Sequence, residues 1–188
     1  MYSPSQIATL TRDCDAVLIP MGTPVFLREG EQVYITQALG GSFTVQVNGN
    51  LVRIDAKDAD ALGLSSDAAL PETPGVILQK EAHGPVEEEA LWEQLRTCYD
   101  PEIPVNIVEL GLVYRCEVVA VSSTFNRVEI DMTLTAPGCG MGPILVSDVY
   151  GKIATVPNVT DVKVELVFDP PWDQSRMTEA ARLQLGLL

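Results

Sequence analysis

Two runs in the second half of the chain alternate apolar and polar side chains, Gly111 to Val121 and Arg127 to Leu134. A period of two places alternate side chains on opposite faces of a β-strand. The polar segment Ser122 to Asn126 separates the runs and suits a hairpin loop. We therefore predict two paired strands, the second of which carries on one face Val128, Ile130, Met132 and Leu134.

The segments before and after this hairpin have apolar residues at the spacing of a helix. Apolar residues three and four apart predict a helix that holds Pro85 in its first turn and ends before Asp100-Pro101, with the stripe Ala90, Leu91, Leu95 and Cys98. Two further helices, at 144–156 and about 176–185, enclose a third predicted strand at 162–168. The order helix–strand–strand–helix–strand–helix predicts an α/β sandwich with a mixed three-stranded sheet.

The first half follows a different pattern, in which short apolar pieces rich in β-branched residues are punctuated by glycines. The dipeptide Asn48-Gly49 supplies the positive φ angles of a tight hairpin turn. We predict a small all-β domain, a barrel or a sheet, and a short helix after it at 56–64. Its predicted strands are 16–20, 24–27, 32–36 and the hairpin 43–54.

Prolines and small polar residues interrupt both patterns between residues 65 and 85. This composition is typical of a linker, although Val76 to Leu78 is also compatible with an extra strand. We predict an α+β protein with an N-terminal domain and linker at 1–82 and a second domain at 83–188.

The chain has 188 residues and a net charge of −14, from 12 Lys and Arg against 26 Asp and Glu. Such a field repels phosphate backbones and anionic lipid, so nucleic acid and membrane surfaces are disfavoured as partners. No apolar run approaches the ~20 residues of a membrane span. The first residues lack a basic segment followed by an apolar core, so no secretory signal is expected and cytoplasmic residence is predicted.

Four cysteines and one histidine, His83, are the candidate soft ligands. They contain no Cys-x-x-Cys pair, which disfavours a closed zinc or iron–sulfur site within one chain. Cys98 and Cys116 are expected to pack in the core. Cys14 stands between Asp13 and Asp15, whose charge disfavours its thiolate, and His83 is expected to be exposed.

The fourth cysteine, Cys139, lies in the turn Ala136 to Met141, between a predicted strand and a predicted helix. Unpaired N–H groups and the helix dipole favour a thiolate at such a place, and a thiolate attacks electrophiles or binds soft metals. The flanking Gly138 and Gly140 permit close approach of backbone or ligand. A structural cysteine beside a tight turn is the alternative.

Three segments of the second half, in order and spacing, resemble signatures of the small iron–sulfur cluster assembly domain. They are Asp100 to Tyr114, Thr135 to Cys139, and Pro170-Pro171-Trp172 followed by Met177 to Ala181. This domain occurs in SufT proteins, in PaaD and in the cytosolic iron–sulfur targeting factors. The β-rich first half is similar to an extension that precedes the domain in SufT.

The resemblance implies an accessory factor in iron–sulfur cluster maturation that transfers clusters or iron to client apoproteins. It implies a pocket in which Cys139 approaches Asp100 and Glu102 and shares a transient iron or cluster, none being bound permanently. Thr135, with the two glycines, would support this pocket. Expected partners are the assembly machinery and client apoproteins, and one ligand thiol per chain is compatible with a homodimer.

Alternative interpretations remain for these residues. Asp100 and Glu102 are also ordinary turn formers, and Thr135 suits a hydrogen bond at a strand end. Trp172 closes the core over the last helix or contacts a client. An adaptor that docks clients without metal is a second candidate function. A cysteine-nucleophile enzyme is disfavoured, because the single histidine lies far from Cys139 in the sequence.

Overall fold

The computed structural model describes residues 6–39, 42–64 and 81–187. The chain divides into two compact units. The first comprises Met1–Leu70 with two short later segments, Pro101–Pro104 and Cys139–Met141, and the second comprises Pro71–Asp100, Val105–Gly138 and Gly142–Leu188. The extra strand considered at Val76 to Leu78 lies outside the described residues. The predicted domain boundary at residues 82 and 83 stays a prediction.

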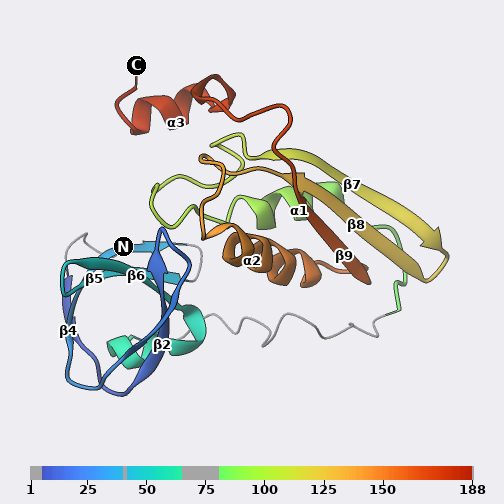
Figure 1. The fold of residues 1–188 in the computed structure, drawn as a ribbon. Helices are drawn as coiled ribbons and strands as arrows, with labels where there is room; N and C mark the ends of the chain where they lie inside the picture. The colour runs from blue at the N-terminus through green and yellow to red at the C-terminus, as the bar shows by residue number, and fades with distance from the viewer. Residues whose placement is uncertain (1–5, 40–41, 65–80, 188) are drawn as a thin grey trace. The chain divides into compact units, whose positions relative to one another are not determined.

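An antiparallel six-stranded sheet forms the first unit, in the order β1-β4-β5-β6-β2-β3 (Figure 1). Its strands are β1 (Gln6–Thr9), β2 (Cys14–Ile19), β3 (Pro24–Leu27), β4 (Gln32–Leu39), β5 (Ser42–Val47) and β6 (Asn50–Asp55). Inward-facing aliphatic side chains from these strands form its core, with Val33, Val45 and Ile54 fully buried. The predicted β-rich first half is confirmed, and β1 is a strand that the sequence pattern did not indicate.

The hairpin between β5 and β6 has the turn expected from its sequence. Val47 pairs with Asn50, and the two residues between them have positive φ, 49° at Asn48 and 81° at Gly49. Asparagine and glycine tolerate this conformation better than other residues. The register of this central hairpin is therefore set locally.

A 3₁₀ helix, η1 (Ala56–Leu62), follows β6. Its end is set by Gly63, which has a φ of 70°, so the helix is shorter than the predicted 56–64.

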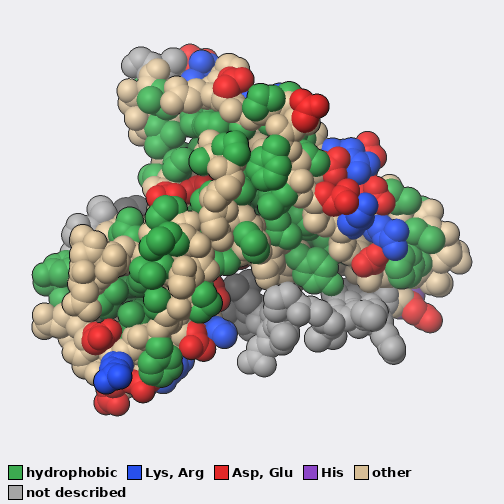
Figure 2. Space-filling model, in the orientation of Figure 1, with side chains coloured by type: hydrophobic (Ala, Val, Ile, Leu, Met, Phe, Trp, Pro, Cys, Tyr) green, Lys and Arg blue, Asp and Glu red, His purple; other side chains and the backbone are tan. Residues whose placement is uncertain are grey.

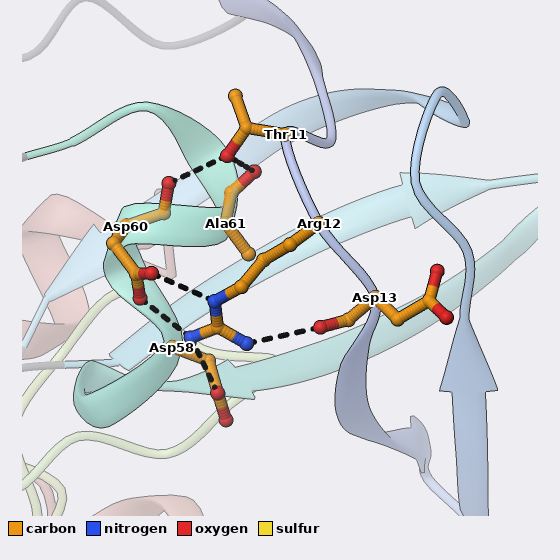
Figure 3. A network of polar contacts seen from close by, with 6 residues as sticks. All are labelled: Thr11, Arg12, Asp13, Asp58, Asp60 and Ala61. Atoms are coloured by element: carbon orange, nitrogen blue, oxygen red, sulfur yellow. Dashed lines mark hydrogen bonds and ion pairs between the residues drawn. The ribbon is translucent and has the colours of Figure 1, made fainter.

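The guanidinium of Arg12 attaches η1 to the loop between β1 and β2 (Figure 3). Its Nε donates to Asp60 Oδ2 at 2.7 Å, and its Nη2 lies 2.6 Å from Asp60 Oδ1 and 3.0 Å from Asp58 Oδ1. The hydrogen bonds from Arg12 lower the pKa of the Asp60 carboxyl. This ion pair network joins residues that are almost fifty positions apart.

A three-stranded sheet in the order β7-β8-β9 forms the framework of the second unit. Its strands are β7 (Val113–Ser122), β8 (Phe125–Met132) and β9 (Asp161–Leu166). β7 and β8 form an antiparallel hairpin, whereas β8 and β9 are parallel. The predicted mixed three-stranded sheet is confirmed.

Alternation along β8 gives this sheet two unlike faces. Val128, Ile130 and Met132 are fully buried, on the face that α1 (Glu88–Leu95) and α2 (Gly142–Ala154) cover in Figure 1. Acidic and basic side chains interleave on the other face (Figure 2). The α2 crossover joins the parallel strands, which a short turn cannot connect. The predicted buried face of this strand is correct, except that Leu134 is buried just beyond the strand's end.

The first helix of this unit is shorter than predicted. α1 begins at Glu88, because Glu87 is extended and Asn158 Nδ2 donates to the carbonyl of Pro85 at 2.9 Å, holding that residue before the helix. It ends at Leu95, after which the backbone N–H groups of Thr97 and Cys98 donate to the carbonyls three residues before them, at 3.0 Å and 3.1 Å, as in a tight turn. The predicted placement of Pro85 inside the helix, and the helix end at Asp100, are wrong.

The C-terminal segment contains two short helices rather than one. A 3₁₀ turn, η2 (Gln174–Arg176), precedes α3 (Glu179–Gln184). Thr178 caps α3, because its hydroxyl accepts a hydrogen bond from the N–H of Ala181 at 3.2 Å. The predicted start at residue 176 is therefore wrong by three residues.

Candidate functional site

Cys139 lies in the loop between β8 and α2, in a half-buried position. Gly138 before it has a φ of 83°, a conformation that an L side chain adopts with strain. Within the first compact unit, the Cys139 Sγ is 3.9 Å from the carbonyl oxygen of Pro20. The thiol is thus held at a loop and not inside a strand or a helix.

Cys139 lies in the expected turn between a strand and a helix, and the helix begins two residues earlier than the predicted 144. α2 begins at Gly142, three residues after the cysteine, with Gly140 and Met141 in the intervening turn. The helix dipole acts within the first turn of a helix. The thiol therefore lies before the helix and not at its first residue.

The other three thiols lie in less reactive surroundings. Cys98 is fully buried, and its Sγ lies 3.7 Å from the carbonyl oxygen of Gln94. Burial raises the pKa of the Cys116 thiol to about 11, and Glu88 adds to the effect. Burial also raises the pKa of Cys14, followed by the charge of Asp58. The expected disfavouring of the Cys14 thiolate is therefore correct in direction, but the main cause is burial and not the neighbouring Asp13 and Asp15.

The two predicted carboxylates lie in a loop that is closed at its base. An isolated bridge pairs Tyr99 with Asn106, and the Ile107 N–H donates to the Cys98 carbonyl at 2.9 Å. Between these residues, the Asp100 side chain is buried and that of Glu102 is exposed. A closed base fixes where the loop begins and ends.

Asn106 continues this loop into the next turn. Its Oδ1 accepts hydrogen bonds from the backbone N–H groups of Val108 and Glu109, at 3.1 Å and 2.9 Å. This Asx arrangement is a local substitute for backbone pairing. It explains why an asparagine occupies the middle of the first family-like segment.

Lys152, on α2, is a residue near this loop that the sequence did not indicate. Its side chain is only 6% exposed, and its Nζ lies 2.6 Å from the Thr97 carbonyl oxygen and 3.3 Å from Asp148 Oδ2. A buried lysine needs such partners, because an unpaired buried charge is costly. Lys152 therefore anchors the chain just before the Asp100 loop. No sequence signal separates it from a solvated helical lysine.

Glu102 belongs with Cys139 to the first unit, whereas Asp100 belongs to the second. Among the residues that the structure describes, no group of three His, Cys, Asp or Glu side chains is arranged to hold a metal ion. The approach of Cys139 to the two carboxylates stays a prediction.

Of the remaining predicted site residues, Thr135 and Gly140 lie in the same segment between β8 and α2 as Cys139, whereas Trp172 lies in the C-terminal segment. Thr135 is half-buried in the bend after β8, and Gly140 is half-buried in the turn before α2. The Trp172 indole donates to the Leu110 carbonyl at 2.8 Å, so it contacts the turn after the Asp100 loop. Its closure of the core over the last helix stays a prediction. His83 is exposed, as predicted.

Comparison with known proteins identifies the class of this protein. Residues 88–166 match the family of iron–sulfur cluster assembly proteins. An Fe-S protein maturation auxiliary factor of Porphyromonas gingivalis is 45% identical over 101 residues, which are 54% of this chain and 92% of that protein. This chain belongs to the iron–sulfur cluster assembly protein family.

Another relative carries the name SufT. The Fe-S protein maturation auxiliary factor SufT of Staphylococcus aureus is 39% identical over 88 residues, covering 47% of this chain and 96% of that protein. That SufT is too short to contain a counterpart of the six-stranded sheet as well. The expected similarity of the first half to a SufT extension therefore has no support from this relative.

One solved structure is similar over the same share of the chain. A domain of unknown function from Bacillus anthracis is 39% identical, covers 54% of this chain and 92% of its own, and has a TM-score of 0.49. Separately, no helix within the described part of the chain is long and apolar enough to cross a membrane.

Proposed function

We propose that this protein is an accessory factor in iron–sulfur protein maturation, in which Cys139 contacts the iron or cluster that is passed to a client. Membership of the iron–sulfur cluster assembly family supports the class of function. The maturation role of its relatives supports an auxiliary and not a catalytic part. The cluster is cargo here and not a resident cofactor.

The observation that carries the role of Cys139 is the contrast among the four thiols. Cys14 and Cys98 are buried in the core, and burial holds the pKa of Cys116 at about 11. Cys139 alone of the four lies in a glycine-flanked loop between elements. A thiolate binds soft metal and exchanges ligands only where metal and partner reach it.

The carboxylates of Asp100 and Glu102 assist the same contact in this proposal. A single thiolate with oxygen ligands binds iron more weakly than four thiolates do, and weak binding permits release. The ligands that one chain lacks would come from the assembly machinery, a client, a small thiol or a second protomer. Each of these partners supplies ligands transiently.

The test is anaerobic reconstitution of the full chain with iron and sulfide, followed by absorbance and by transfer to an apo-aconitase. We expect Cys139→Ser to lose transfer, while Cys116→Ser, which removes a thiol from a strand, retains it. Asp100→Asn and Glu102→Gln should weaken transfer to a smaller degree. Transfer by Cys139→Ser at the wild-type rate would refute the role of this thiol.

A cellular assay separates the carrier from the adaptor. Cells lacking the protein are complemented with wild type or Cys139→Ser under iron limitation, and aconitase activity is measured at equal protein level. A carrier requires the thiol, so the variant should not restore activity. Full restoration of aconitase activity would refute the carrier and favour the adaptor, which docks clients without binding metal.

A further inference from the structure

We propose that the outer edge of β7 binds an extended, basic segment of another protein by strand addition. β7 is the outermost strand of its sheet and pairs with β8 on one side (Figure 1). No described strand pairs with its other side. This surface uses none of the residues of the Cys139 loop, and the inference does not rest on the proposed function.

The length and composition of β7 distinguish it from a protected edge. It has ten residues, against about five or six in a typical strand. Proteins protect exposed edges with prolines, lysines, short strands or bulges. β7 contains neither proline nor lysine, and its register irregularities fall only near its two ends, leaving Arg115 to Ala120 in continuous register.

The second half of β7 presents apolar side chains to solvent. Val118, Val119, Ala120 and Val121 are four successive apolar residues, and all but the first are exposed. Val121 is 56% exposed and Val119 is 37% exposed. A run of this kind on a surface is a folding liability unless it serves binding.

Charge next to this run indicates the chemistry of the partner. Arg115 makes ion pairs with Glu117 at 3.1 Å, with Glu129 at 3.3 Å and with Asp131 at 2.7 Å. One guanidinium thus pairs with three carboxylates. In the register between β7 and β8, Glu117 lies directly opposite Glu129. Like charges in that position are destabilising. A basic side chain placed on the free side of Glu117 would relieve this excess of negative charge.

The register between β7 and β8 then specifies which side chains the partner segment should carry. Glu117 and Val119 share the charged face of the sheet, since they pair with Glu129 and Arg127. An added strand places its own side chains opposite these residues on the same face. The matching segment has a Lys or Arg opposite Glu117 and a β-branched residue two positions away, opposite Val119. Backbone hydrogen bonds to the edge would supply the rest of the affinity.

A second copy of this chain fits the edge less well. Each copy carries a net charge of −14, so two copies repel one another. Self-pairing would also bring the carboxylates of a second β7 edge toward the excess negative charge beside Glu117. A basic partner is attracted by both features.

The test uses the full chain, labelled with nitrogen-15, and the synthetic peptide Thr-Val-Thr-Val-Thr-Lys-Thr as probe. We expect saturable shifts of backbone amides within β7 and β8. Affinity should fall roughly tenfold in Val119→Lys and for a peptide with Glu in place of Lys. Leu183→Lys, at a 69% exposed position on α3, is the matched control and should bind as wild type does. Val119→Thr keeps β-branching and tests the apolar contact if the lysine variant does not fold.

Four results would overturn the proposal. The first is no saturable binding at millimolar peptide, and the second is equal binding of the Lys and Glu peptides. The third is a wild-type dimer in light scattering that becomes monomeric in Val119→Lys, which would make a second copy the occupant. Shifts confined to other elements would equally exclude the β7 edge.

Discussion

The indole N–H of Trp172 donates to the carbonyl oxygen of Leu110 at 2.8 Å, across sixty-two positions of sequence. Nearby, the backbone N–H of Thr178 donates to the Glu109 carbonyl at 3.0 Å. The guanidinium of Arg176 lies 4.4 Å from the ring centre of Tyr114. The first and third family-like segments are therefore parts of one packed structure in the second unit.

Replacing Trp172 by Phe should destabilise the second unit by about 1–2 kcal/mol, because it leaves the Leu110 carbonyl without its indole donor. Urea unfolding followed by circular dichroism measures this change. Trp92→Phe is the control, since the Trp92 indole makes no hydrogen bond to the described residues. If Trp172→Phe matched the control in stability but lost cluster transfer, client contact would be the better role for this residue.

Gly111 permits the close contact between these segments. It has a φ of 69°, and a Cβ there would lie 2.3 Å from the Arg176 carbonyl oxygen. Gly111→Ala should therefore cost at least about 3 kcal/mol, from backbone strain and the clash together. Gly186 has a φ of 70° and nothing within 4 Å, so Gly186→Ala should cost only about 1–2 kcal/mol. Equal losses of stability in the two variants, measured by thermal unfolding, would contradict a clash at Gly111.

Limited labelling with iodoacetamide should modify Cys139 before the other thiols near neutral pH. Burial shields Cys98 and Cys14, and the pKa of Cys116, raised to about 11, leaves little thiolate at that pH. Peptide mapping by mass spectrometry identifies the labelled site. Faster labelling of Cys116 in folded protein would refute this order. Raising the pH toward 11 should increase labelling of Cys116.

The fragment 83–188 should fold cooperatively without the first unit. Its core contains several fully buried side chains, among them Leu91, Ile130 and Ile153. The Staphylococcus relative is also covered almost entirely by an alignment of 88 residues. Circular dichroism and amide exchange of the purified fragment test this prediction. A fragment without protected amides would show that the N-terminal sheet completes its core.

The ion pair between Arg12 and Asp60 should make the stability of the first unit depend on acid pH. Hydrogen bonding lowers the pKa of Asp60 in the folded state from its ordinary 3.8. Its contribution is therefore present above pH 3.8 and is lost as pH falls through the lower folded value. Asp60→Asn should be less stable than wild type at pH 6, and this difference in stability should shrink as the pH falls below 3.8. A difference of unchanged size under acid would exclude this cause.

The sequence by itself determined the elements that depend on neighbouring residues. Alternation identified the β8 face of Val128, Ile130 and Met132, and Asn48-Gly49 identified a turn, because strand period and positive φ are local properties. The three family-like segments likewise indicated the class of protein.

Helix ends and the surroundings of single side chains were decided by tertiary structure. α1 begins after Pro85 because Asn158, more than seventy positions away, bonds to that carbonyl. Lys152 is buried because the Thr97 carbonyl and Asp148 accept its charge. The pKa of Cys14 is raised chiefly by burial and not by its acidic neighbours. Burial and long-range hydrogen bonds arise only when distant segments pack together, so no local pattern records them.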